Sequence, residues 1–226
     1  MLDKYEKDIE VLLAWYERAK EATIIAESLD TVNGSFIQTL HEQRYSFDHF
    51  IRSVVYDKDG SSEEKVRKAI SAAISHLHRG YSDSVEWIYV SVLDEYTSFL
   101  KNFNTEQIAK GFPNYYSEIR PELDKIKNQI DKYKINKSIE KVSDAITEEE
   151  AVELAEASNQ YLSENLIHKL RQYLEMLHER QGTLLEIANR DRKEEKRKTI
   201  KDNIILPIIT GMVGAVLGAL LVLVIT

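Results

Sequence analysis

The stretch Ser62–Phe103 reads SEEKVRKAISAAISHLHRGYSDSVEWIYVSVLDEYTSFLKNF. Its apolar and aromatic side chains recur every three or four residues, the spacing that keeps them on one face of an α-helix. Gly80 is its only glycine and the stretch has no proline, so Gly80 is the one strong helix breaker within it. The sequence therefore predicts one very long helix here, with a buried face made of Ile74, His78, Tyr81, Val85, Ile88 and Val92.

The same spacing continues through most of the chain, which has only eight glycines and three prolines in 226 residues. A first helix is expected to end at the Asn33-Gly34 turn, and a second to run from Phe36 to Tyr56. Ser61 with Glu64 has the form of a capping box that opens the long helix. We therefore expect an all-α bundle, with core faces at Tyr5, Ile9, Leu12, Tyr16 and Ala19 and at Leu40, Phe47, Ile51 and Val54.

Beyond Phe103 the pattern breaks around Gly111 and Pro113, and a lysine-rich region follows. Thr147 is followed by three glutamates, whose charge complements a helix N-terminus. A last helix is expected to continue from there as a stalk, with its apolar face at Leu162, Leu166, Leu170, Tyr173 and Leu177.

Residues 204–225 read IILPIITGMVGAVLGALLVLVI and carry no charge. As a helix they would be ~33 Å long, about the thickness of the hydrocarbon core of a bilayer. The sequence predicts one C-terminal transmembrane helix over residues 203–226. The N-terminus has no apolar signal segment, so we expect a single-pass protein of the cytoplasmic membrane with a cytoplasmic helical body.

Two features accompany the apolar end. Small residues at helical spacing allow membrane helices to approach closely, which favours a homo-oligomer. Cations on the cytoplasmic flank are expected to contact lipid headgroups. The small residues are Gly211, Gly214, Ala215 and Gly218, and the cations are Arg190, Arg192, Lys193, Lys196, Arg197, Lys198 and Lys201.

The chain is thus expected to divide into a helical bundle (1–103), further helices and the stalk (104–187), a basic segment (188–202) and the membrane helix (203–226). The first 187 residues hold 23 basic and 34 acidic side chains, a balance unlike that of proteins that bind duplex DNA. The chain has no cysteine, its histidines lack metal-binding spacing, and no glycine-rich cofactor loop occurs. We therefore expect neither a metal nor a cofactor.

One polar constellation interrupts the expected core. Arg44 falls on the apolar face of the second helix, with His41 and Asp48 one turn away on either side and His49 next. The third helix carries a similar set, in which His76 and His78 should point to different faces. We expect a shared polar network or ligand site formed by His41, Asp48, His76, His78, Arg79, Asp83 and Glu86, and a structural ion pair between Arg44 and Asp48 is the plainer alternative.

The spacing from Arg44 to His49 resembles the Arg-x4-6-His signature of the HEPN superfamily of small helical proteins, many of them ribonucleases. Arg171 and His178 give a second match to the looser spacing. The resemblance implies a metal-independent ribonuclease in which His49 is the general acid or base and Arg44 stabilises the phosphate charge. Five helical steps place these two side chains about 140° apart, so catalysis would need local distortion or a second subunit.

The first hypothesis for function is a non-enzymatic, tail-anchored effector or adaptor that self-associates in response to a protein partner, RNA or nucleotide. In this hypothesis the clustered C-terminal helices perturb the bilayer or gate a membrane pore. The chain resembles membrane-tethered HEPN accessory proteins of RNA-guided defence, and this resemblance implies a role in antiviral defence. The alternatives are the membrane-tethered ribonuclease and a structural scaffold.

Overall fold

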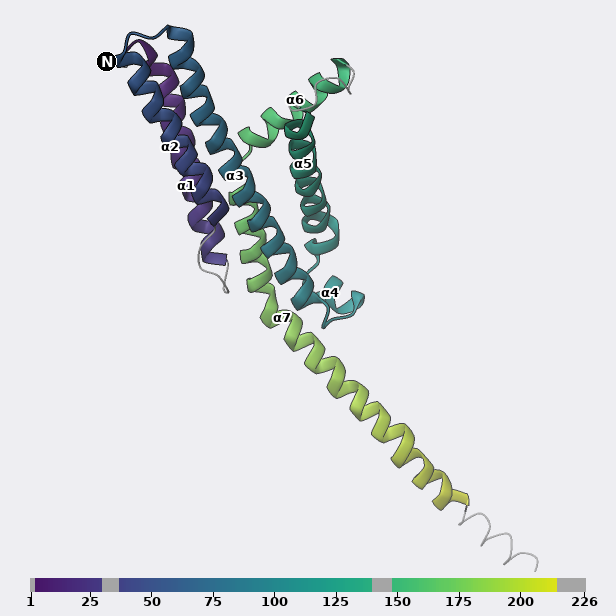
Figure 1. Cartoon of the computed structure of the whole chain (residues 1–226). Coiled ribbons are helices and arrows are strands. Elements are labelled where there is room, and N and C mark those ends of the chain that lie inside the picture. Colours follow the sequence, from purple (N-terminus) through teal and green to yellow (C-terminus); the bar gives the residue numbers. More distant parts are fainter. Residues whose placement is uncertain (1–2, 30–36, 140–147, 215–226) are drawn as a thin grey trace, which may run out of the picture.

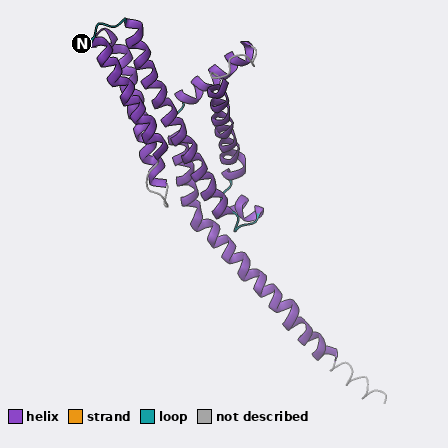
Figure 2. Cartoon of the chain, in the orientation of Figure 1, coloured by secondary structure: helices purple, strands orange, loops and turns teal. Residues whose placement is uncertain are grey.

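The computed structural model describes residues 3–29, 37–139 and 148–214, and within them the chain is helical, with no strand (Figures 1 and 2). The prediction of an all-α bundle is therefore confirmed. Its elements are η1 (Asp3–Tyr5), α1 (Glu6–Leu29), α2 (Ile37–Lys58), α3 (Glu63–Leu100), α4 (Thr105–Gly111), η2 (Tyr115–Ile119), α5 (Arg120–Ile139), α6 (Glu148–Ser163), α7 (Leu166–Ile200) and η3 (Lys201–Ile205).

The long helix α3 is the centre of the fold. Helices α1 and α2 lie along its first part, whereas α5 and α7 pack against its second part (Figure 1). Gly60 turns the chain into α3 with a φ of 70°, a conformation that favours glycine. The cap of α3 is Ser62, whose side chain accepts a hydrogen bond from Lys65 N, so the predicted capping box on Ser61 is wrong by one residue.

The main hydrophobic core runs along α3 and joins side chains of α1, α5 and α7, and a smaller cluster of Tyr5, Val66 and Ile70 lies at the start of α3. Buried tyrosines connect the helices, since Tyr161 donates to Ser82 Oγ at 3.3 Å and Tyr96 donates to the carbonyl of Tyr173. Burial raises the pKa of both phenols, so each remains a neutral donor at physiological pH. These contacts fix α6 and α7 against the second part of α3.

Two π-helical segments each end two residues before a proline. Segment η2 ends at Ile119 before Pro121, and η3 ends at Ile205 before Pro207. Proline lacks an N–H and its ring clashes with the carbonyl four residues earlier. In both places the residue before the proline donates instead to the carbonyl five residues back, which widens the turn and lets the helix continue.

The predicted continuous helix from Thr147 through Leu177 is wrong, because the chain breaks between α6 and α7. Glu164 and Asn165 lie outside both helices. Asn165 then caps α7 by accepting a hydrogen bond from His168 N at 3.3 Å. An asparagine at this position satisfies a free N–H of the new helix and allows the chain to turn.

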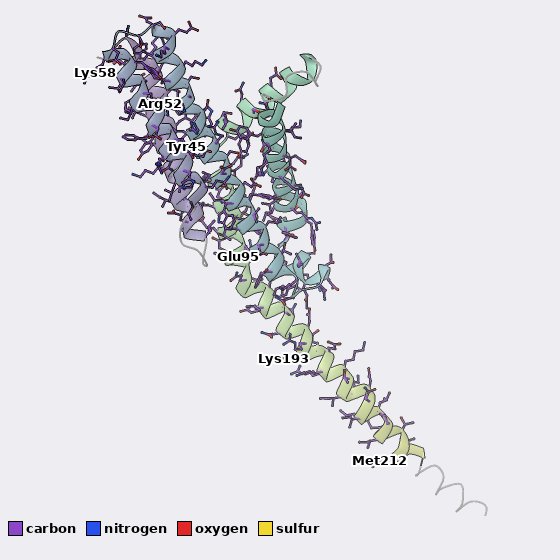
Figure 3. The ribbon with its side chains drawn as sticks, viewed as in Figure 1. Tyr45, Arg52, Lys58, Glu95, Lys193 and Met212 are labelled. Carbon is purple, nitrogen blue, oxygen red and sulfur yellow. The ribbon has the colours of Figure 1, made fainter. Side chains whose placement is uncertain are left out.

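The helical chain continues beyond residue 187, where the predicted stalk was expected to end, and leaves the body. Residues 188–214 are called the stalk from here on, and Figure 3 marks Lys193 and Met212 on it. Among the described residues no helix is both long and apolar enough to cross a membrane.

This finding corrects the predicted transmembrane helix over 203–226 and the predicted single-pass membrane localisation. Of the four small residues expected to pack in the membrane, Gly211 and Gly214 lie exposed on the stalk. Ala215 and Gly218 lie outside the described residues.

Helix α4 docks on α7 at a glycine, which gives a first prediction. A Cβ at Gly111 would lie 2.7 Å from Leu184 Cδ2 and 3.1 Å from Ile187 Cδ1, so Gly111→Ala must displace a buried leucine. We expect a loss of about 1–2 kcal/mol in the free energy of unfolding, measured in urea. Gly182→Ala on the same helix meets no atom within 4 Å and should gain about 1 kcal/mol. Equal effects of the two substitutions would contradict the close packing.

Candidate functional site

Helix α2 turns small and polar side chains toward α3. Thr39, Ser46 and Ser53 recur every seven residues and are buried, and half-buried Glu42 and His49 lie between them. The facing position on α3 is Gly80, where an added Cβ would lie 3.4 Å from Glu42 Cβ and 3.7 Å from the Thr39 carbonyl oxygen. The two helices therefore lie close together, with their polar groups between them.

Three side chains form a polar network across this interface. Glu42 Oε2 accepts a hydrogen bond from Arg79 Nε at 2.9 Å and lies 2.7 Å from His76 Nδ1. Arg79 also contacts His76 Nδ1, so the histidine proton decides whether this nitrogen donates to Glu42 or accepts from Arg79. The His49 ring stacks on His76, with centroids 5.1 Å apart.

The network shifts the pKa values of its members. Burial by itself would raise the pKa of Glu42, but hydrogen bonds and charge from His76 and Arg79 outweigh burial and lower it. Burial, followed by the charges of His76 and Arg52, lowers the pKa of His49. Glu42 is thus held as a carboxylate, and His49, which stacks on His76, is held neutral.

The predicted site is only partly assembled in the structure. His76 and Arg79 come together, but their partner on α2 is Glu42, which sequence reasoning missed. His41 and Asp48 are exposed instead. The seven-residue spacing of Thr39, Ser46 and Ser53, which places Glu42 on the same face, was the signal that could have revealed it.

The remaining predicted residues of α3 serve other contacts. His78 packs edge-on against Trp15 of α1, with ring centroids 4.1 Å apart, while His76 faces α2. The prediction that these two histidines point to different faces is therefore confirmed. Glu86 forms an ion pair with Lys134 of α5, and Asp83 is half-buried on the same helix.

The predicted core face of α2 is wrong, because most of it points away from α3. Phe47 is 62% exposed, and Leu40 and Ile51 are exposed beside it. On α1 the predicted core residue Tyr16 is exposed, and Leu13 next to it is 57% exposed. Together these five side chains form the α1–α2 outer face, and Figure 3 marks Tyr45, Arg52 and Lys58 along α2.

A groove of about 290 Å³ opens between α1 and α2 in this face. It exists because both helices pack on α3 and touch each other much less. Leu13 and Tyr16 form its α1 wall, Phe47 and Phe50 form its α2 wall, and Leu77 of α3 closes the base. The groove is lined mainly by carbon and resembles the unfilled position of a helix bundle.

Arg44 and His49 lie on different sides of α2, as their spacing predicts. His49 faces α3, whereas Arg44 is exposed within the α1–α2 outer face. No ion pair joins Arg44 to Asp48, although both are described. Within one chain, this arrangement does not direct Arg44 and His49 at a common phosphate. In the described part of the chain, no cluster of three His, Asp or Glu side chains could hold a metal ion.

Comparisons with protein-family models, with curated proteins and with solved structures gave no match for this chain. The HEPN-like resemblance and the role in defence therefore stay predictions. The basic side chains of 188–202 lie on the stalk, where all seven are exposed, and their contact with lipid headgroups also stays a prediction.

The polar network gives a second prediction. Glu42→Gln leaves Arg79 and His76 without their carboxylate, and we expect a loss of about 1–3 kcal/mol in the free energy of unfolding at pH 7. Because the folded-state pKa of Glu42 is lowered, its contribution is complete above the ordinary value of 4.5 and is lost as the pH falls below it. The difference between wild type and variant should therefore shrink in acid.

Chemical denaturation from pH 7 to pH 3 measures this difference. Glu179→Gln, an exposed carboxyl on α7, is the matched control and should have almost no effect. A Glu42→Gln penalty that stayed constant over the whole pH range would contradict the ion pair.

Proposed function

We propose that the chain is a self-associating helical adaptor whose copies meet through the α1–α2 outer face. The observation that supports this most strongly is the orientation of α2, which packs its small and polar side chains inward and leaves Leu40, Phe47 and Ile51 outward. Full burial of a side chain of this size contributes ~1.5–3 kcal/mol. A contiguous exposed row of them is typical of a protein-binding surface.

The charges within the outer face favour a second copy as the occupant. Arg44 lies among the exposed apolar side chains of α2, and Glu17 lies beside Leu13 and Tyr16 on α1. Neither Arg44 nor Glu17 forms an ion pair with any described residue of its own chain. Arg44 and Glu17 therefore offer opposite charges to a second copy, which is the pattern of a self-complementary interface.

A two-fold axis parallel to the helices would bring these charges together. It lays α1 of one copy on α2 of the other and keeps residues at equal heights along the bundle. Tyr16 and Gln43 line the same end of the groove. Glu17 directly follows Tyr16 on α1, and Arg44 directly follows Gln43 on α2. Glu17 of one copy then faces Arg44 of the other, and Phe47 enters the partner's groove.

Such an assembly has the character of an adaptor, because the outer face offers a partner apolar side chains to pack against and charges to pair with. The activator that controls assembly, whether a protein, RNA or a nucleotide, would then act by changing the orientation of α1 or α2. A metal-independent ribonuclease remains the alternative hypothesis, and it would need Arg44 and His49 to be contributed by different copies.

Phe47→Glu tests the apolar part of the interface. It places a charge at the centre of the proposed contact, where burial without a partner is costly, so we expect the full-length chain to become monomeric. Val90→Glu is the matched control, because Val90 is 48% exposed on α3, away from the groove, and should not change assembly. Sedimentation velocity over a concentration series distinguishes the two. A monomeric wild type, or a Phe47→Glu variant that still associates, would disprove the proposal.

Charge reversal tests the arrangement of the two copies. Arg44→Glu and Glu17→Arg should each weaken association about tenfold, since each places like charges opposite one another. The double variant restores opposite charges and should recover most of the lost affinity. If the loss of association free energy in the double variant equals the sum of the losses in the two single variants, these residues do not meet.

A further inference from the structure

A second feature, separate from the α1–α2 outer face, lies where α7 begins. Helices α1, α3 and α7 enclose a cavity of about 300 Å³ that is lined mainly by polar atoms. The side chains that give it its chemistry are Arg18 and Glu21 of α1, Tyr81 of α3, and Asn165, His168 and Arg171 at the start of α7. The polar network around Glu42 lies on the other side of α3 and shares none of them.

Arg18 is held in a fixed orientation at the wall of this cavity. Its guanidinium lies over the rings of Trp15 and Tyr81, 4.3 and 5.0 Å from their centroids. One of its nitrogens donates to the carbonyl of Leu162 at 2.7 Å. Arginine carries five N–H donors, so Arg18 is oriented by the protein and still has donors for a ligand.

Arg171 and His168 supply groups that the fold itself does not use. Neither side chain forms a hydrogen bond or ion pair with any residue that the structure describes. Both are exposed at the cavity mouth, and they lie three residues apart on the same side of α7. They can therefore turn toward a ligand without breaking an existing contact.

The charge of the cavity contrasts with that of the whole chain. Two arginines and a histidine face one acidic side chain, Glu21, whereas the protein as a whole has a net charge of −8. The positive end of the 35-residue helix α7 adds to this local field. A small anion with several acceptor oxygens is the ligand that best matches two guanidinium groups.

We propose that this cavity binds a phosphate monoester, with Arg18 and Arg171 as its main ligands and His168 as an additional donor. At about 300 Å³ the cavity is at the lower end of the range for ligand sites, so the phosphate and the group next to it fill it. The phosphate belongs either to a small sugar phosphate or to the 5′ end of an RNA strand. Because α1 lines both this cavity and the α1–α2 groove, occupancy is positioned to affect association.

Isothermal titration calorimetry of the full-length chain tests the site with four probes. Ribose 5-phosphate is compared with ribose, and a short 5′-phosphorylated RNA is compared with the same RNA bearing a 5′-hydroxyl. Only the phosphorylated member of a pair should bind, and affinity should fall as salt is raised. Binding of ribose 5-phosphate assigns the site to a small ligand, and binding of the phosphorylated RNA alone assigns it to an RNA end.

Arg171→Gln should weaken binding of the phosphorylated probe about tenfold, the effect of losing one charge-assisted contact. Arg180→Gln is the control, since Arg180 is an exposed arginine of the same helix outside the cavity. Glu21→Gln should strengthen binding.

The proposal is overturned if no phosphorylated probe binds at millimolar concentration, or if Arg171→Gln binds as tightly as the wild type. Sedimentation velocity of Arg171→Gln without ligand tests the two proposals separately. The variant should associate as the wild type does, because Arg171 lies outside the α1–α2 outer face, even though it binds the phosphorylated probe more weakly.

Discussion

The close packing of α2 on α3 is the constraint from which the other surfaces follow. Gly80 adds no side chain of its own where it meets Thr39 and Glu42, and Ser46 and Ser53 keep the rest of this face of α2 small. A small-residue interface has no room for phenylalanine or leucine, so the large apolar residues of α2 must lie on its other side. The same packing brings Glu42 within reach of His76 and Arg79 and places the α1–α2 groove at the surface.

The second part of α3 follows a different packing rule. There, large side chains such as Tyr96, Ile88 and Leu100 are buried against helices that come later in the chain. Figure 1 shows α5 and α7 alongside this part of α3, with α7 continuing beyond the body. The polar cavity lies between the first and second parts of α3. The chain breaks at Glu164 and Asn165, so α7 starts beside α1 and leaves a space that no large side chain fills.

The helices themselves could be predicted from the sequence, but their faces could not. Periodicity located α3 to within a few residues, because its apolar side chains, its acidic first turn and Gly60 all agree. It failed on α2, where the most apolar face is exposed, because periodicity reports that a face is apolar and not which molecule covers it. Glu42 was missed because the apolar pattern of α2 predicts the wrong core face, although the small residues Thr39, Ser46 and Ser53 mark the face on which Glu42 meets His76 and Arg79.

The long uninterrupted helix α7 has a mechanical consequence. Among the described residues, the last hydrogen bond that joins this helix to the body runs from Gln107 to Asp191, and the helical chain then continues to residue 214, about 35 Å farther. A rotation of ~5° about that contact would move the far end by ~3 Å, the length of two residues of helix. The first turns of α7 line the polar cavity about 30–38 Å before that contact, so the helix connects a ligand-sized space to a segment of similar length that extends away from the body (Figure 1).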